Sequence, residues 1–588
     1  MMNKKNKLKS LQTTRFIFQQ SKTVWKYQVT TIGLSIIAGV LFVVFTLALS
    51  DFVNLTTSGV MSAGDFALQF SKLLICFISV AVMTVMVGYI QQVATLRTTK
   101  HLWKTTLKSV NQSTVTDVNS FSQGDILTRV LSDASELSGI VGSFYPTLIS
   151  QMVIFAFSLF ALNLLSQPLS LIFLAFAPLF PIIAWFESKS LPKKTMSQRQ
   201  AYSKVTEAIR VRLQGFRTIK ALNADKYLNE EFDKESTTFL KAATSLVWKA
   251  NEFGGIFTVM KFTFPVIILG AGFFFFTQNI ISLGAVFAFY LVSGQAYGPL
   301  FALGSSLATY YQTSPRVNRI IDLLDIPKEP EGITELGPID TIGFDKVSFE
   351  YKQSPILKAV SFSLKKGEHV GLVGATGSGK STILGLLNLF YRTNTGKVIL
   401  NGEDIQSFSP VDIRNKVVLV SSNDLLINDT VRNNVTLFDA VSDGDLIKAL
   451  SIASVSFPLD TLITERTVSE GERQRLCLAR ALVRKPEVLL LDEALSGVDS
   501  KIEFEIFQKI MGSFPDITLI VVSHRLSTIR LMARLMFLSN GMIICENSID
   551  DLFQSSPEFR SLIEKQLIQP DVDTYKLKAQ NNPSAYIQ

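Results

Sequence analysis

The stretch from residue 374 to residue 382 constrains the fold more than any other part of the chain. It follows an apolar run at 370–373 that is typical of a buried strand, and it precedes a helical pattern that starts at Ile383. This is the pattern G-x-x-x-x-G-K-[ST] in its strand–loop–helix setting. Glycines let backbone N–H groups wrap a triphosphate, and the helix N-terminus adds positive partial charge. The predicted ATP-binding residues here are Gly374, Ala375, Thr376, Gly377, Ser378, Gly379, Lys380, Ser381 and Thr382.

Two side chains at the end of this loop have separate predicted roles. Lys380 would bridge the β- and γ-phosphates, and the Ser381 hydroxyl would hold Mg²⁺. The alternative is a glycine-rich turn that binds nothing, which the flanking strand and helix argue against. ATP and Mg²⁺ are therefore the expected cofactors.

The composition indicates membrane spans. The chain has 588 residues, too many for one core, of which 47% are hydrophobic and only 18% charged. Its net charge of +8 fits basic cytoplasmic loops of a membrane protein better than nucleic-acid binding. With three cysteines far apart and three histidines, neither a disulfide framework nor a histidine-built metal site is expected.

Six apolar segments each approach the roughly 20 residues that a bilayer requires. Buried core helices are the alternative, but the segments are too many and lack a polar stripe. The loops at 96–143 and 188–255 are rich in Lys and Arg, whereas the other three loops have none. The positive-inside rule then predicts a multi-pass plasma-membrane protein with both termini cytoplasmic. The predicted spans are 29–50, 66–95, 144–163, 168–187, 256–278 and 282–309.

Two charges and one aromatic stripe leave alternatives open. Lys72 and Lys261 interrupt predicted spans, so each is a candidate functional residue. The alternative is that each snorkels to the membrane surface or lines a water-filled cavity without selecting a substrate. Aromatic and glycine residues recur at helical spacing from Phe287 to Gly298. That face would either line a cavity for an amphipathic substrate or pack against a helix.

The fold class predicted is a six-span α-helical membrane domain followed by an α/β nucleotide-binding domain with a phosphate loop. Three prolines, at positions 327, 330 and 338, mark the junction, and short strands alternate with helical patterns beyond it. Expected strands include 417–420, 488–491 and 518–522. The predicted segments are a cytoplasmic head (1–26), the membrane domain (27–325), a linker (326–340), the ATPase domain (341–566) and a polar tail (567–588).

Further residues with ATP chemistry follow the phosphate loop. An apolar strand ends in Asp492, placed to hold Mg²⁺, and Glu493, placed to polarise the attacking water as general base. His524 ends another apolar strand and could hydrogen-bond the γ-phosphate. Tyr351 lies upstream, where an aromatic ring can stack on adenine.

These motifs together resemble the nucleotide-binding domain of ABC transporters. The run Val468–Arg475, here called the signature segment, is similar to that family's signature motif, and the six spans resemble the membrane half of an ABC exporter half-transporter. The runs Phe121–Asp133 and Leu213–Lys220 resemble its two cytoplasmic loops. Ser496–Asp499 resembles its D-loop.

The resemblance implies a dimer in which the signature segment of one chain closes over the ATP held by the other. Ser469 and Gly471 match the positions that contact that phosphate. The spacing Ser469-x-x-Glu472 independently predicts a capping box at a helix start, which would aim the helix N-terminus at the partner's γ-phosphate.

The chain departs from the family pattern in three places. Glu470 and Glu472 bring acid close to a polyanion where the family has Leu-Ser-Gly-Gly-Gln; Glu472 preserves the cap, but Glu470 has no such role. Ser422 stands where the family carries a glutamine that contacts Mg²⁺ and water. The segment 449–468 is shorter than usual, which would alter the coupling between ATPase and membrane domain.

These departures bear on the partner. In a homodimer both composite sites would be alike and slightly impaired. In a heterodimer a second half-transporter with a poor base and a normal signature would complement this chain. We favour the homodimer, in contact with membrane lipid and without nucleic acid.

The resemblance implies ATP-driven export by alternating access. The weakly charged, aromatic spans suit an amphipathic peptide or a small hydrophobic substrate, and a specialised peptide exporter is the substrate prediction. Alternatives are a multidrug or lipid exporter, and a weakly hydrolysing regulatory subunit of a heterodimeric exporter.

Overall fold

The computed structural model describes residues 14–57, 62–179, 182, 191–332, 334–351, 354–464 and 466–561. These residues form two compact units, which are described separately. The membrane unit comprises the described residues up to Asn111 and those from Phe121 to Ile326. The ATPase unit comprises Gln112–Ser120 and the described residues from Pro327 onward.

One short segment belongs to a different unit from the one that the sequence suggests. Residues 112–120 were expected within the membrane domain, but they hydrogen-bond to the ATPase unit. The Glu329 amide donates to the Gln112 carbonyl at 2.8 Å, and the Thr116 hydroxyl donates to the Phe390 carbonyl at 3.3 Å. The segment ends in a single helical turn, α4 (Val115–Val118), capped by Thr114.

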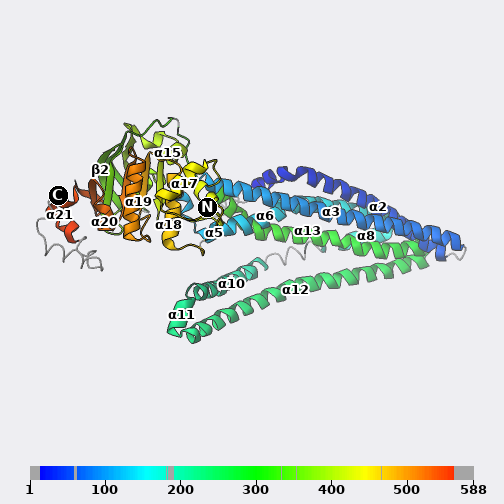
Figure 1. Cartoon of the computed structure of the whole chain (residues 1–588). Coiled ribbons are helices and arrows are strands. Elements are labelled where there is room, and N and C mark those ends of the chain that lie inside the picture. Colours follow the sequence, from blue (N-terminus) through cyan, green and yellow to red (C-terminus); the bar gives the residue numbers. More distant parts are fainter. Residues whose placement is uncertain are drawn as a thin grey trace. The chain divides into compact units, whose positions relative to one another are not determined.

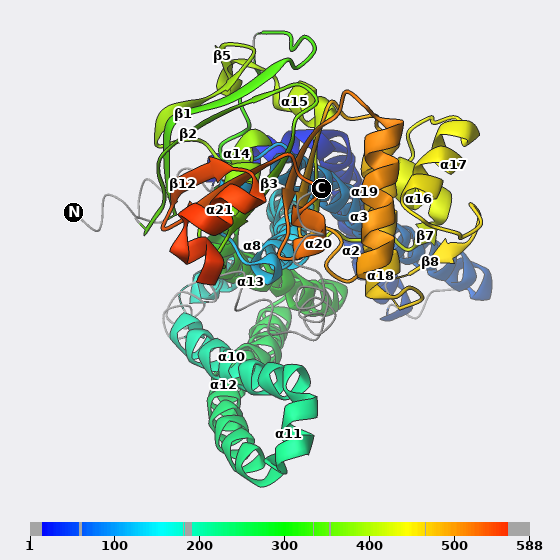
Figure 2. The same cartoon turned by 60° about the vertical axis from the view of Figure 1, so that its left-hand side comes forward.

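The membrane unit is built from long helices (Figure 1). Between α3 and α7 the chain runs through short helical pieces: α5 (Gln123–Thr128), η2 (Arg129–Asp133), α6 (Ala134–Gly139) and η3 (Ile140–Phe144). The main helices are α2 (Trp25–Thr57), α3 (Ala63–Asn111), α7 (Tyr145–Leu165), α8 (Gln167–Phe176), α10 (Leu191–Gln214), α11 (Phe216–Leu222), α12 (Asp225–Thr277) and α13 (Leu283–Leu324). In Figure 2, α10 folds back along α12, with α11 at the turn.

Four helical stretches of the described chain have the length and apolar composition to cross a membrane. They are Thr14–Thr57, Ala63–Asn111, Gln123–Leu165 and Asp225–Thr277. The first three predicted spans lie within the first three of them, and the fifth, 256–278, lies within the last except for its final residue. The sixth lies in α13, and the fourth begins as α8 and continues into residues outside those described.

The aromatic stripe on α13 includes a packing residue. Tyr297 is 3% exposed, and its ring centroid lies 4.8 Å from that of Phe173 and 5.7 Å from that of Phe264. The stripe therefore joins α13 to α8 and α12 at this position. Lys72 and Lys261 are exposed on the surface of their unit, so a role for either stays a prediction.

The ATPase unit contains a six-stranded sheet in the order β12-β11-β3-β10-β9-β6. The central strands β3 (His369–Gly374), β10 (Thr518–Val522) and β9 (Val488–Asp492) pair in parallel, as does β6 (Val417–Ser421) with β9. They are nearly continuous apolar runs because both faces of the sheet are covered. The edge is closed by the antiparallel pair β11 (Arg534–Ser539) and β12 (Met542–Asn547).

Helices cover both faces of this sheet, and the side chains alternate between them. Leu489 and Leu491 face a core shared with α18 (Glu470–Leu482) and α19 (Ser500–Ser513). Val488 and Leu490 face a second core shared with α14 (Lys380–Leu387) and a four-stranded sheet, β2-β1-β4-β5.

The remaining elements of the ATPase unit are shorter. The strands are β1 (Thr341–Tyr351), β2 (Ser354–Lys365), β4 (Thr395–Leu400), β5 (Glu403–Asp404), β7 (Asp429–Thr430) and β8 (Leu462–Ile463). The helices are α15 (Pro410–Lys416), α16 (Val431–Thr436), α17 (Asp443–Ile452), α20 (Leu526–Ile529) and α21 (Ile549–Ser555). Figure 2 shows α16 and α17 beside α18 and α19.

Candidate ATP site

The phosphate loop connects β3 to α14, as the sequence predicts. Gly377 and Gly379 have φ angles of +81° and +111°, a region in which glycine is favoured. Gly374 allows a close approach, because a Cβ there would lie 2.2 Å from the Leu538 carbonyl oxygen. The loop can therefore turn its amides inward at the N-terminus of α14, where a phosphate would meet positive partial charge.

Lys380 is held inside this loop. Its side chain is 6% exposed, and Nζ donates hydrogen bonds to the carbonyls of Gly374 at 2.8 Å and Ala375 at 3.0 Å. Burial lowers the pKa of Lys380, while Glu493 and Asp492 act in the opposite direction. The ammonium group is thus kept within the cradle that a triphosphate would enter.

Asp492 and Ser381, the two residues predicted to hold Mg²⁺, lie within hydrogen-bonding distance of each other. Asp492 ends β9, and its carboxylate hydrogen-bonds the Ser381 hydroxyl from the first turn of α14. Burial raises the pKa of Asp492, and the Ser381 hydrogen bond opposes that shift. A carboxylate and a hydroxyl held together in this way fit a hard cation, which would offset the cost of the buried charge.

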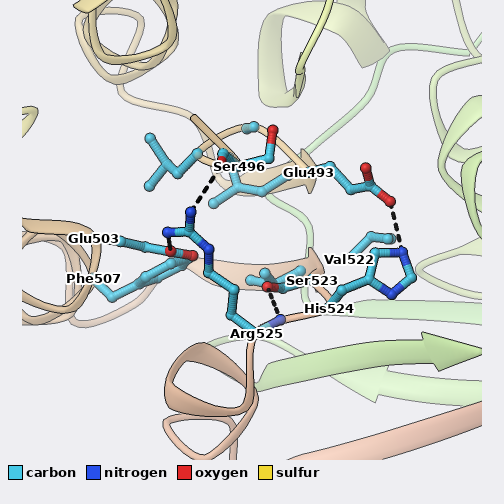
Figure 3. A pocket seen from close by; sticks show the side chains of 12 residues that line it. Glu493, Ser496, Glu503, Phe507, Val522, Ser523, His524 and Arg525 are labelled. Carbon is cyan, nitrogen blue, oxygen red and sulfur yellow. Dashed lines mark hydrogen bonds and ion pairs between the residues drawn. The ribbon is translucent and has the colours of Figure 1, made fainter. Parts of the chain in front are cut away.

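Glu493 and His524 lie together (Figure 3), and Glu493 also lines a cavity with residues of the phosphate loop. Glu493 follows β9 with a φ of +52°, and its amide donates to the Val522 carbonyl at 3.1 Å. His524 follows β10, and its Nε2 lies 2.8 Å from Glu493 Oε1. The left-handed turn at Glu493 directs the carboxylate out of the strand toward the neighbouring one.

Tyr351, at the end of β1, reaches the same region. Its hydroxyl shares hydrogen bonds with Thr382 and Tyr391, and burial is the largest cause of its raised pKa. Its ring meets that of Tyr391 edge-on at 5.2 Å. A cavity of about 210 Å³ is lined by Tyr351, Ile356, Thr376, Gly377, Gly379, Lys380, Ser381, Thr382 and Glu493.

The signature segment does not contribute to this cavity. Among the described residues that line it, none comes from Val468–Arg475. Ser469 instead caps α18: its Oγ accepts from the Glu472 amide at 3.3 Å, and the Glu472 carboxylate accepts from the Ser469 amide at 2.8 Å. The predicted capping box is confirmed, and Gly471 lies within the first turn that it starts.

Sequence reasoning missed an arginine that anchors the D-loop. Arg525 donates to the Ser496 carbonyl at 2.7 Å and pairs with Glu503 at 2.5 Å (Figure 3). It also donates to the Val498 carbonyl. Glu503 is 4% exposed and also accepts from the Thr528 hydroxyl at 2.6 Å. Arg525 directly follows His524, which is the one signal in the sequence that could have drawn attention to it.

Comparison with known proteins finds a matching family model for each unit. The family model "ABC transporter transmembrane region" matches residues 29–300, and the model "ABC transporter" matches residues 357–496. A Staphylococcus aureus protein, provisionally named a multidrug export ATP-binding/permease protein, is 29% identical over 72% of this chain and 76% of its own length. A Bacillus subtilis protein of the same provisional name is 27% identical over 75% of this chain and 78% of its own.

A solved structure has the same fold. It is a bacterial Atm1-family ABC exporter with ATP bound, which superposes with a TM-score of 0.79 at 21% identity, covering 92% of this chain and 99% of that one. The two matched regions follow one another along a single chain, and apart from residues 112–120 each lies in one of the two units described above. The chain belongs to the ABC exporter family: it is a half-transporter, with an apolar multi-pass membrane domain fused to an ATP-binding ABC ATPase that drives transport.

Proposed function

We propose that two copies of this chain form the exporter, with each ATP held between the phosphate loop of one copy and the signature segment of the other. ABC half-transporters function as dimers. The observation that carries the proposal is the division of the site: Lys380, Ser381 and Glu493 line one cavity, whereas Ser469 and Gly471 lie at the start of α18 and line none of it. A second copy would supply the missing side.

Within each site the chain's own residues have distinct roles. Tyr351 stacks on the adenine, Lys380 and the loop from Gly374 to Thr382 hold the phosphates, and Ser469 and Gly471 close over them from the other copy. Ser381 and Asp492 would hold Mg²⁺, which would neutralise phosphate charge. Glu493 accepts a proton from the attacking water. His524, whose Nε2 lies 2.8 Å from Glu493 Oε1, orients that carboxylate and the γ-phosphate.

The substrate that we propose is an amphipathic compound of the multidrug type, moved outward across the plasma membrane. The relatives' provisional names support this class, and the aromatic, weakly charged membrane helices suit it. The narrower peptide prediction finds no support in these comparisons. The basic loops support cytoplasmic termini, because Lys and Arg favour the cytoplasmic side.

A regulatory subunit that barely hydrolyses is disfavoured by the catalytic geometry. Lys380, Asp492, Glu493 and His524 are all present around one site. Ser422, which replaces the glutamine of the family pattern, and Glu470, the acid in the signature segment, are the arguments for weak hydrolysis.

The test is Mg²⁺-dependent ATP hydrolysis by the chain purified alone in lipid nanodiscs, beside Glu493→Gln. Turnover that falls by about 10²-fold or more in Glu493→Gln, with ATP binding kept, supports the homodimer. Hydrophobic cations and amphipathic peptides can then be compared by their effect on the rate. ATP binding without turnover in either protein would contradict the homodimer and direct attention to a second chain.

A further inference from the structure

Glu470, the acid that departs from the family signature, is turned back onto its own chain. Its carboxylate forms an ion pair with Arg473, one turn along α18, with one contact at 3.1 Å from Nε and a second from Nη2. It also accepts from the Gln474 side-chain amide at 3.0 Å. The arginine lowers the pKa of Glu470, so the group stays ionised while its charge is matched.

Arg473 connects this pair to the loop that follows β6. The loop, Ser421–Leu425, is here called the β6 loop. The guanidinium of Arg473 donates to the Ser422 carbonyl at 2.5 Å and to the Asp424 carbonyl. The Arg473 side chain is 15% exposed and thus well packed between the two segments. Ser422 is also tied to the metal-binding strand, because its amide donates to the Asp492 carbonyl at 3.1 Å.

The same acid touches the D-loop. A Cβ at Gly497 would lie 2.7 Å from Cγ of Glu470, so the acid's stem lies directly on this glycine. Gln474 donates to Ser496 Oγ at 3.2 Å and accepts from the Gly497 amide at 2.8 Å. Glu470 therefore joins the signature segment, the β6 loop and the D-loop within one chain.

We propose that Glu470 is a positioning residue that acts in its own chain: through Arg473 it fixes the β6 loop beside Asp492, at the position where Ser422 replaces the family's glutamine. This inference rests on the proposed two-chain site. The two unusual residues, Glu470 and Ser422, are then connected through one arginine. An ion pair supplies the placement of the loop that a short serine side chain cannot supply itself.

The simpler view is that Glu470 repels the partner's triphosphate and impairs its site. The two views differ in which chain is affected. Acting through the β6 loop, Glu470 influences the site that contains its own Asp492 and Glu493. Acting on phosphate, it influences the site that contains the partner's Glu493.

Mixed dimers separate the two views. Two differently tagged chains are co-expressed, one carrying Glu493→Gln, so that only the site with the intact Glu493 turns over. Glu470→Gln is then placed either on the chain with the intact Glu493 or on the other chain. We expect kcat to fall about tenfold in the first arrangement, because a charge-assisted hydrogen bond is lost, and to stay unchanged in the second. Glu470→Gly, which restores the family residue, should act in the same direction.

A second measurement does not require mixed dimers. Hydrogen exchange in a peptide covering 420–427 is followed by mass spectrometry in the full chain in nanodiscs. Glu470→Gln and Arg473→Gln should each speed exchange in the β6 loop, and the double variant should add little to either. Glu505→Gln removes an exposed acid from α19 and is the matched control, with neither exchange nor turnover altered.

Three results would overturn the inference: faster turnover when Glu470→Gln lies opposite the active Glu493, equal effects in both arrangements, or unchanged exchange at 420–427. Mixed dimers that carry only Glu493→Gln in one chain test the proposed function separately. If these fail to hydrolyse ATP at all, the two-chain site is wrong, and the exchange measurement alone decides the role of Glu470.

Discussion

At the scale of single residues, the candidate ATP site contains charged groups whose burial is energetically unfavourable. In the ATPase unit Lys380 is buried and Asp492 is half-buried. Burial lowers the pKa of Lys380 and raises that of Asp492, so both shifts favour the neutral forms. The cost is tolerated because each group has a partner, Ser381 for Asp492 and the loop carbonyls for Lys380. A site that stores such a cost without nucleotide can release it when phosphate and metal arrive.

Asp492→Asn should therefore stabilise the nucleotide-free ATPase unit while abolishing turnover. The native-state pKa of Asp492 is raised, so its ionised form costs stability as pH rises through the range above 3.8. The gain in Tm should be larger at pH 7 than at pH 4, at about 2–4 °C per kcal/mol of relief. Thermal unfolding of both proteins in nanodiscs at the two pH values measures it; an equal or opposite difference would show that burial does not control this carboxylate.

At the scale of elements, an ion pair between Arg525 and the buried Glu503 holds the loop between β9 and α19. The D-loop has no regular structure, yet its carbonyls at Ser496 and Val498 bind Arg525, which Glu503 fixes from α19. The N-terminus of α19 and the turn after β10 are thereby connected across the D-loop. This connection places a loop that crosses the proposed dimer interface.

Replacing Glu503 should lower the free energy of unfolding of the ATPase unit. Glu503→Ala leaves the partly exposed Arg525 without its carboxylate partner, and losing the buried partner of such a hydrogen-bonded pair costs about 1–3 kcal/mol. Glu505→Ala, two residues along the same helix but exposed, should change stability by less than about 0.5 kcal/mol. Urea unfolding followed by a probe in the ATPase unit compares them; similar midpoints for both variants would refute a structural role for the Arg525–Glu503 pair.

At the scale of the whole molecule, the proposed division of each ATP site between two copies dictates how defects combine. Lys380 belongs to one side of a site and Ser469 to the other. Two defects on one chain then damage both sites, whereas the same defects on different chains meet in a single site and spare the other.

Mixed dimers that carry Lys380→Ala on one chain and Ser469→Ala on the other should occlude about half as much ATP as the unmodified dimer. Dimers with both changes on one chain should occlude less. The measurement is retention of labelled ATP under Glu493→Gln trapping conditions. The reverse order would mean that each site is built within one chain.

The sequence predicts what is local and leaves out what depends on distant contacts. The phosphate loop, the strands at 417–421, 488–492 and 518–522, and the capping box at Ser469 each follow from a continuous pattern, and the structure has them. The contact between Arg473 and the β6 loop does not follow from the sequence, because Ser422 lies 51 residues earlier in the chain. The placement of 112–120 with the ATPase unit likewise rests on hydrogen bonds to residues far away in sequence.

The length of α12 has a mechanical consequence. The helix runs from Asp225 to Thr277 without interruption, and about 45 Å of it, at 1.5 Å per residue, precede the predicted fifth span. If α12 tilts about a point at the bilayer surface, its length converts a small angle into a large displacement. A tilt of about 5° moves the far end of the helix by roughly 4 Å, the width of a side chain. A small rearrangement of the packing around Phe264 among the membrane helices would therefore displace α11 by about the width of a side chain.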